Sequence, residues 1–163
     1  VYPVSDEYML ADVIFKPGTM VDYEDVSQEV LFENIQKQIV EEIRNAKYVI
    51  WIAMAWFTDP VLYRELIKKK RQGLTIEIVV DDNSKNRNAE FCLDDEFPTH
   101  WVTIESLYKN IMHDKFCIID LKTVIHGTFN WTKAANYNKE TISIDRNRTT
   151  AEEFADEFMK LKK

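Results

Sequence analysis

The sequence has few of the residues that define several protein classes, with two cysteines, three glycines and four prolines among 163 residues. Two cysteines are too few for a disulfide framework. Cys92 and Cys117 also lie in unlike local settings, so two reduced thiols are expected. No apolar run approaches the length of a membrane span, and no signal peptide is visible. These absences exclude a disulfide-stapled scaffold and give no indication of a membrane-spanning segment.

Basic residues are scarce near the N-terminus, and this scarcity sets the overall charge. The net charge is −7, and residues 1–33 hold eight acids against a single base, Lys16. Residues 34–163 therefore balance twenty acids against twenty bases. Because the acidity is local, a basic face that binds nucleic acid elsewhere on the molecule stays open.

The residues that are present have the composition of an ordinary globular protein, with 45% hydrophobic and 30% charged residues. The length fits one domain over residues 1–163, in which residues 1–12 are a candidate peripheral extension. We expect a cytoplasmic protein. Residue 1 is Val rather than Met, so removal of a leader and excision from a longer chain stay open.

Strand-like and helix-like patterns alternate along the chain. Residues 48–56 and 74–81 are apolar runs of strand length, as in a sheet that is covered on both faces. Between them, Asp59 as N-cap, Pro60 at the first helical position and Gly73 after the last turn delimit a helix. Further strands are predicted at 12–18, 100–107, 115–120, 123–127 and 140–145. A helix is predicted at 26–46, a polar loop at 82–88, a short helix within 88–99 and a helical turn at 131–136. The chain is expected to end in a helix with Phe154, Phe158 and Leu161 on one face and Thr149 or Thr150 as its cap. The expected fold class is α/β, a mixed β-sheet flanked by helices on both faces.

Residues 113–130 place polar side chains among apolar ones in a specific pattern. The stretch from HDKFCIID to GTFN fits H-x-K-x4-D-x6-G-S/T-x-N, with His113, Lys115, Asp120, Gly127, Thr128 and Asn130 in the defined positions. Alternate side chains of a strand share a face, so His113 and Lys115 are expected to point the same way. Gly127 allows close backbone approach where the returning strand ends, which brings Thr128 and Asn130 next to that pair.

An imidazole, an ammonium, an amide and a hydroxyl gathered in one place suit a phosphodiester. Its non-bridging oxygens need cationic and amide donors while a nucleophile attacks phosphorus. A neutral imidazole can be that nucleophile and would form a phosphohistidine. The motif holds no carboxylate cluster for Mg²⁺ or Zn²⁺, so neither a metal nor another cofactor is expected. A second protonatable group is needed to protonate the leaving alkoxide.

These residues resemble the phospholipase D superfamily, also called the HKD family, and most of all its small single-motif, Nuc-like endonucleases. The resemblance includes the order of strand, aromatic-Phe-Thr turn, helix, basic end, Gly and strand over residues 48–82, and it covers about residues 13–145. It implies a phospholipase D-like fold in a single catalytic domain. It also implies a homodimer, because the single-motif proteins place the motif histidine, here His113, opposite its copy across a two-fold axis.

The resemblance also implies a role for each site residue. His113 is the nucleophile, Lys115 and Asn130 hold the phosphoryl oxygens, Glu140 matches the downstream acid that orients a motif histidine, and Thr128 matches the hydroxyl beside it. The implied activity is that of a metal-independent phosphodiesterase. It is a nuclease that hydrolyses DNA or RNA through a phosphohistidine, with no stable membrane association. Asp120 completes the motif, and we expect it to fix the strand turn rather than to react.

Several alternatives stay open on sequence grounds. A lipid phosphodiesterase of the phospholipase D or cardiolipin type would use the same residues, and a catalytically silent nucleic-acid-binding module would keep the fold. Trp56, Phe57 and Trp131 flank the expected site and could bind substrate by stacking on bases, although aromatics at strand ends more often pack in the core. Residues 67–73 form either a solvated basic helix end or a phosphate contact. His126 is expected to lie outside the site.

Overall fold

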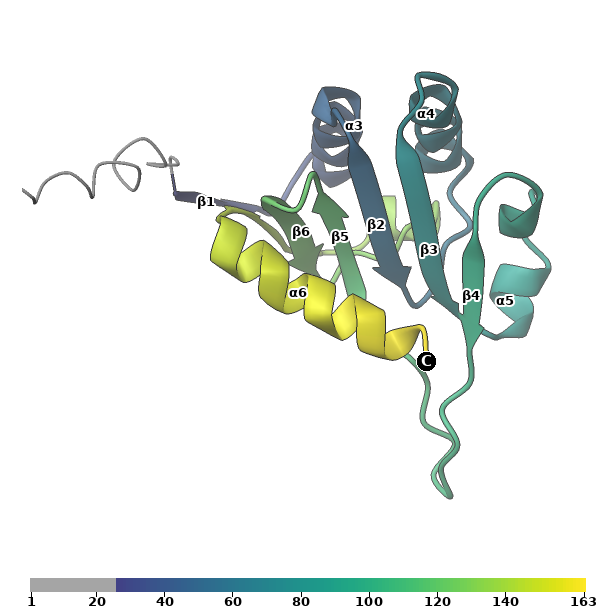
Figure 1. Cartoon of the computed structure of the whole chain (residues 1–163). Coiled ribbons are helices and arrows are strands. Elements are labelled where there is room, and N and C mark those ends of the chain that lie inside the picture. The colour runs from purple at the N-terminus through teal and green to yellow at the C-terminus, as the bar shows by residue number, and fades with distance from the viewer. Residues whose placement is uncertain (1–25) are drawn as a thin grey trace, which may run out of the picture.

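The computed structural model describes residues 26–163, so the predicted strand at 12–18 and the candidate extension at 1–12 lie outside the described part. Within it, seven strands form one sheet in the order β1-β7-β6-β5-β2-β3-β4. Figure 1 shows this sheet together with the helices that flank it. The strands are β1 (Ser27–Leu31), β2 (Val49–Met54), β3 (Thr75–Asp81), β4 (Thr99–Val102), β5 (Lys115–Ile119), β6 (Thr123–Gly127) and β7 (Ile142–Arg146). The helices are α3 (Ile35–Asn45), α4 (Pro60–Arg71), α5 (Ser84–Arg87) and α6 (Arg148–Leu161), with short 3₁₀ turns η1 (Leu93–Asp95) and η2 (Ala134–Tyr137).

The sheet is mixed, as the sequence predicts. Strands β2, β3 and β4 run parallel to one another. Strands β5, β6, β7 and β1 form an antiparallel series, and β5 joins the two parts by pairing antiparallel with β2. Consequently the last residues of β2, β3 and β6 and the first residues of β5 and β7 lie at the same end of the sheet. This end is called the motif end below, because it carries the first residues of β5.

Helices cover both faces of the sheet, which confirms the predicted fold class. Helices α3 and α4 lie on one face and α6 crosses the other (Figure 1). Side chains of β2 point to both faces of the sheet and pack against both helix layers. Ile50 and Ile52 belong to the cluster that contains Leu62 of α4, whereas Ala53 belongs to the cluster that contains Phe158 of α6. A strand buried on both faces is therefore apolar at nearly every position, as the run at 48–56 predicted.

The helix predicted after β2 is present, and the cap residues named from the sequence delimit it. The Asp59 carboxylate accepts a hydrogen bond from the Val61 backbone N–H at 2.8 Å, and Pro60 is the first helical residue. Gly73 follows the helix with φ of +100°, a left-handed conformation that glycine adopts at little cost. Here local sequence signals and tertiary structure agree.

Three local predictions were wrong, and the strand predicted at 100–107 is shorter than expected, because β4 ends at Val102. Residues 26–46 form a strand and a helix instead of one helix, because residues 27–31 pair with β7 and Asn34 adopts φ of 55° before α3. Apolar residues in this segment have a spacing that suits a helix, yet the first of them pair with the edge of the sheet and form β1.

Within the predicted polar loop at 82–88, residues 84–87 form α5. The cap of α6 is Asn147, whose side chain accepts from the Thr150 N–H at 3.2 Å, and not a threonine.

Candidate active site

The motif residues gather at the motif end of the sheet, contributed by neighbouring strand ends. Lys115 opens β5 opposite Met54, the last residue of β2. Gly127 closes β6 opposite Ile142, the first residue of β7. The antiparallel order of β2, β5, β6 and β7 thus brings together the flanks of four strands that are far apart in the sequence.

His113 and Lys115 are in direct contact, which agrees with the expectation that they share a face. The Lys115 Nζ lies 3.1 Å from the His113 Nε2 and donates to the His113 carbonyl oxygen at 2.8 Å. His113 is exposed and Lys115 is half-buried. The segment is anchored just before the histidine, because the buried Asp81 carboxylate accepts a hydrogen bond from the Met112 N–H at 2.9 Å.

Partial burial governs the electrostatics of the lysine. It lowers the pKa of Lys115 from its ordinary value, while the carboxylates of Asp114 and Glu140 act in the opposite direction. Burial also raises the pKa of Asp114, and the nearby Glu157 carboxylate adds to that rise. An ammonium that has lost part of its hydration attracts an anion more strongly than one in bulk water. The site is therefore electrostatically suited to a phosphate oxygen.

Gly127 permits the close contact that places Thr128. Its φ is +152°, and a Cβ built there would lie 2.1 Å from the Thr141 carbonyl oxygen and 2.8 Å from the Ile142 Cα. Two backbone segments therefore touch where no side chain fits. Across this contact the Thr128 N–H donates to the Thr141 oxygen at 2.9 Å, and the Thr128 Oγ1 accepts from the Thr141 N–H at 3.0 Å.

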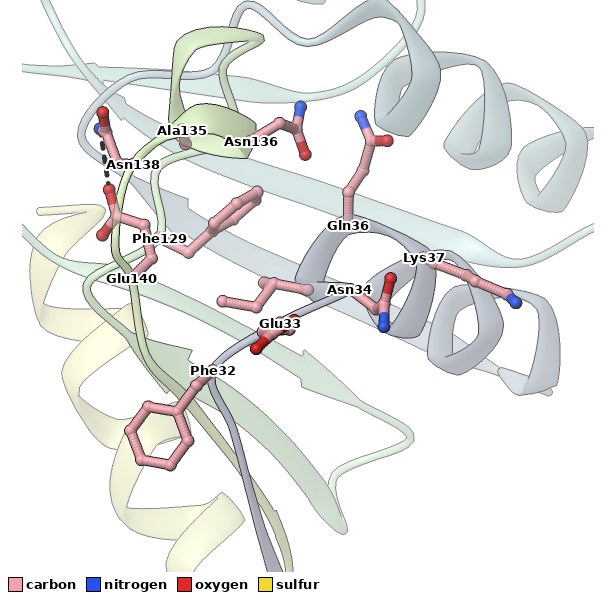
Figure 2. Close-up of a pocket in the computed structure, with 11 residues that line it drawn as sticks. Phe32, Glu33, Asn34, Gln36, Lys37, Phe129, Ala135, Asn136, Asn138 and Glu140 are labelled. Carbon is pink, nitrogen blue, oxygen red and sulfur yellow. Dashed lines mark hydrogen bonds between the residues drawn. The ribbon is translucent and has the colours of Figure 1, made fainter.

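Thr128 and Glu140 form a hydrogen-bonded pair beside the lysine. The Thr128 hydroxyl donates to the Glu140 Oε1 at 2.5 Å, and the Asn138 amide donates to the Oε2 at 3.0 Å. Figure 2 shows the Asn138 contact at the rim of a hollow of about 270 Å³. Amide side chains of Asn34, Gln36 and Asn136 also line this hollow. The Glu140 carboxylate is thus fixed in orientation, with a polar recess next to it.

Asn130 is oriented by the strand end opposite. Its Oδ1 accepts a hydrogen bond from the Trp56 N–H at 3.3 Å, just after β2. With the oxygen occupied in this way, the amide nitrogen can donate both of its hydrogens to a ligand. The Trp56 ring meets the His113 ring edge-on, with centroids 5.6 Å apart. Asn130 and Trp56 therefore belong to the same cluster as the histidine.

Asp120 lies at the opposite end of β5 from Lys115, away from the cluster. Its carboxylate accepts backbone hydrogen bonds from Lys47, Tyr48 and Val49 at 2.9, 2.7 and 3.0 Å. These bonds tie the β5–β6 turn to the start of β2. This position suits the structural role expected for Asp120. Although Asp120 belongs to the motif, it is not one of the catalytic residues, because the length of β5 separates it from the histidine.

Of the three aromatic residues predicted to bind substrate, only Trp56 is accessible. Phe57 is 0% exposed and Trp131 is 1% exposed, and their rings pack edge to face in the core, with centroids 5.0 Å apart. Neither ring has a free face for a base, so their predicted substrate-binding role is corrected to core packing. Trp56 is partly exposed and is the member of the three that remains available to a ligand.

The other histidines and the basic helix end lie away from the cluster. The His126 Nε2 lies 2.8 Å from the Asp145 Oδ2, and its ring contacts Phe154 of α6. The His100 Nε2 lies 2.9 Å from the Glu77 Oε2. The basic run at 67–73 ends α4 where β3 begins, at the opposite end of the sheet, so a phosphate contact at this site is not open to it.

Sequence reasoning missed the residues that support the loop beside the site. Asn86 is buried, donates to the Ala55 and Asp81 carbonyl oxygens at 2.9 and 2.8 Å, and accepts from the Phe57 N–H at 2.8 Å. It thereby joins the ends of β2 and β3. Its signal was a polar segment with three separate asparagines directly after a buried strand, which we interpreted as an ordinary polar loop.

Two other features are absent from the described part of the chain, a metal-binding cluster and a membrane-spanning helix. Among residues 26–163, no group of three or more His, Cys, Asp or Glu side chains is arranged to hold a metal ion. In the same range, no helix combines the length and the apolar character needed to cross a bilayer.

Known proteins are similar to this chain in sequence and in fold. Residues 39–162 match the family described as cardiolipin synthase, PLD-like domain. The chain is 28% identical to a phospholipase D of Rickettsia prowazekii (strain Madrid E) over 119 residues, which are 72% of this chain and 58% of that protein. It therefore spans little more than half the length of that curated relative.

Solved structures confirm the predicted phospholipase D-like fold. The phospholipase D family member Nuc from Salmonella typhimurium is similar, with a TM-score of 0.73 and 26% identity over 84% of this chain and 94% of that chain. NucT from Helicobacter pylori superposes with a TM-score of 0.72, at 22% identity, over 84% of this chain and 96% of that chain. The latter likeness shows the fold alone.

Proposed function

The chain belongs to the phospholipase D superfamily, and from that membership we propose that it is a metal-independent phosphodiesterase that hydrolyses nucleic acid through a phosphohistidine. The observation that carries the proposal is the contact of Lys115 with His113 at the motif end, with Asn130 and the Thr128–Glu140 pair in the same cluster. A nucleophile, a cation and an amide donor around one space meet the needs of attack on phosphorus.

The chemistry divides into two displacements. In the first, the neutral His113 imidazole attacks phosphorus, a P–N bond forms, and the P–O bond to the leaving alkoxide breaks. The Lys115 ammonium balances negative charge on the non-bridging oxygens, and the Asn130 amide donates hydrogen bonds to them. In the second displacement, water attacks the phosphohistidine, the P–N bond breaks, and the imidazole is released.

Both displacements need a second proton carrier, and we propose that it is the partner subunit's His113. It protonates the leaving alkoxide in the first displacement and accepts the proton of water in the second. The chain has three histidines, and the other two are His100, beside Glu77, and His126, beside Asp145, both outside the cluster. Two copies of the chain related by a two-fold axis would supply the missing imidazole. Glu140 would then orient one histidine of this coupled pair.

A lipid phosphodiester is the second candidate substrate, and one surface feature favours it. The loop that precedes the motif exposes apolar side chains, with Leu107 97% exposed and Tyr108 85% exposed. A loop of this kind beside His113 could enter a lipid surface. Incubation with anionic liposomes and with single-stranded DNA distinguishes the two candidates, and cleavage of lipid alone would overturn the nuclease proposal.

Metal independence gives a direct test of the proposed chemistry. We expect hydrolysis of single-stranded DNA or RNA to continue in excess EDTA, because the cluster binds the phosphate through side chains of the protein itself. The measurement is the initial rate with and without EDTA, with the His113→Asn protein as a control for contaminating nucleases. Complete loss of activity in EDTA, restored by Mg²⁺, would contradict the proposal.

Dimerisation is tested by diluting active subunits with inactive ones. After unfolding and refolding together, wild-type and His113→Asn chains form mixed dimers that lack one of the two imidazoles. With a ninefold excess of the variant, the activity per wild-type subunit is expected to fall to about a tenth, since few wild-type chains meet another. The same mixture made with a variant that is active by itself serves as the control. An unchanged activity per wild-type subunit would show that one chain suffices.

A further inference from the structure

A second hollow, which the proposed chemistry does not use, opens beside the candidate active site. Its volume is about 550 Å³, and it lies between α5 and the segment that leads into η2. Hydroxyl, amide and ammonium groups converge on it, with one carboxylate at its border. The lining side chains used below are Thr58, Ser84, Lys85, Asn88, Thr132 and Lys133. We call this hollow the α5 pocket.

Most of the polar side chains of the α5 pocket have no partner. Among residues 26–163, the side chains of Thr58, Ser84 and Asn88 make no hydrogen bond to protein, and Lys85 has no carboxylate within ion-pair distance. Ser84, Lys85 and Asn88 are exposed, so their polar groups are accessible to a ligand from solvent. Thr132 is only 5% exposed, and its hydroxyl oxygen accepts from the Ala135 N–H at 3.2 Å. Its own O–H donates no hydrogen bond within residues 26–163. A buried donor without an acceptor is costly, which indicates a ligand that accepts hydrogen bonds.

The charge of the α5 pocket favours an anion. Lys133 pairs with Glu90 at 3.3 Å, so these two charges largely cancel. Lys85 is left as a positive charge without a partner in the described residues, and its Nζ lies over the Trp56 ring, 5.6 Å from the centroid. An uncompensated ammonium surrounded by hydroxyl and amide donors is a suitable environment for a phosphate.

The α5 pocket is held next to the proposed catalytic histidine. The Trp56 ring contacts both groups, because the Lys85 Nζ lies 5.6 Å from its centroid and the His113 ring centroid also lies 5.6 Å away. The two walls of the pocket are tied together, because the Thr58 N–H donates to the Trp131 carbonyl oxygen at 2.8 Å. Asn86 anchors α5 to the end of β2. The pocket is therefore a fixed neighbour of the site and not an accidental gap between loops.

We infer that the α5 pocket binds the phosphate next to the one that is cleaved, with the intervening nucleotide base against the partly exposed Trp56 side chain. This inference rests on the proposed function and adds to it a preference for a polynucleotide over an isolated phosphodiester. A nucleic acid strand carries a phosphate at every residue and a base between successive phosphates. That order matches His113, Trp56 and Lys85, and base stacking on an aromatic ring adds affinity with little regard to sequence.

The test compares a long substrate with a short one. Wild-type protein, Lys85→Gln and Lys85→Glu are assayed with a single-stranded oligonucleotide and with bis(p-nitrophenyl) phosphate, which has one phosphate and no neighbour. The quantity compared is kcat/KM for the oligonucleotide divided by kcat/KM for the small diester. We expect this ratio to fall roughly tenfold in Lys85→Glu and less in Lys85→Gln, mainly because KM for the oligonucleotide rises. Lys160→Glu, an exposed lysine of α6 outside the pocket, is the matched control and leaves the ratio unchanged.

Each outcome decides the inference. An unchanged ratio in Lys85→Glu, or an equal loss on both substrates, overturns it. If the wild type hydrolyses neither substrate, the proposed function fails, and the inference is decided by titrating a fluorescent oligonucleotide at several salt concentrations. Roughly tenfold weaker binding by Lys85→Glu, with a salt slope smaller by about 0.7, supports the pocket. Equal binding by the two proteins, or cleavage of phospholipid vesicles without cleavage of the oligonucleotide, overturns it.

Discussion

Replacing His113 with Asn lowers kcat for phosphodiester hydrolysis by at least about 10³-fold in the expected result, because the variant has no nucleophile to form the phosphohistidine. Asn keeps the size and polarity of the side chain, and His113 is exposed, so the fold should survive. In the proposed dimer the same substitution removes the second proton carrier as well. The measurement is single-turnover hydrolysis, with incorporation of labelled phosphate into wild-type protein as a direct assay of the intermediate.

His126→Asn is the matched control for this prediction. His126 lies on β6, its Nε2 is 2.8 Å from the Asp145 Oδ2, and its ring packs against Phe154 on the face covered by α6. Losing this contact is expected to cost little stability and to leave kcat near that of the wild type. Retention of more than roughly a tenth of the activity by His113→Asn would contradict the assigned nucleophile. An equal loss in both variants would point to a general effect on the fold.

Gly127→Ala is expected to lower the free energy of unfolding by at least about 3 kcal/mol. The added methyl group would lie 2.1 Å from the Thr141 carbonyl oxygen, and φ of +152° is unfavourable for any L side chain. Both neighbours are backbone, so relief requires separating β6 from the start of β7. That movement would displace Thr128 from Glu140, and activity should fall along with stability. Urea unfolding of the variant and the wild type measures the change in the free energy of unfolding, provided that the two proteins have the same m-value.

Gly73→Ala separates strain from steric overlap. Gly73 also has positive φ, at +100°, but no atom lies within 4 Å of the position of a Cβ. Only the conformational cost applies, and the expected loss is about 1 kcal/mol with no effect on activity. If the two alanine variants were equally destabilised, the close approach at Gly127 would have no energetic consequence, and its role in placing Thr128 would have to be abandoned.

Much of the fold could be predicted from local patterns, because local physics specifies those parts. The apolar runs at β2 and β3 and the Asp59, Pro60 and Gly73 signals around α4 were interpreted correctly. The segment that became β1 and α3 was not. Its helical spacing competes with strand pairing to β7, and the pairing partner lies more than a hundred residues away in the sequence. No local window contains that information.

The candidate site shows the same division. The spacing of His113 and Lys115 indicated a shared face, and the structure places their side chains in contact. The aromatic residues beside the motif were harder to assign, because burial decides whether a ring can bind a base. Phe57 and Trp131 lie inside the core, whereas Trp56 stays partly exposed. Aromatic residues that are neighbours in the sequence can therefore differ in whether they are accessible to a ligand.

By itself, the sequence determined the chemistry that this protein can offer, namely one imidazole, one ammonium and one amide at a spacing that indicates a common site. It also determined that the chain has one of the two motif histidines that the proposed mechanism requires. Only the tertiary structure decided that Asp120 ties a turn to β2, that Glu140 is fixed by Thr128 and Asn138, and that the α5 pocket lies beside Trp56. The physical reason is that residue types and short-range periodicity are properties of the chain, whereas burial and hydrogen-bond partners arise when distant strand ends meet.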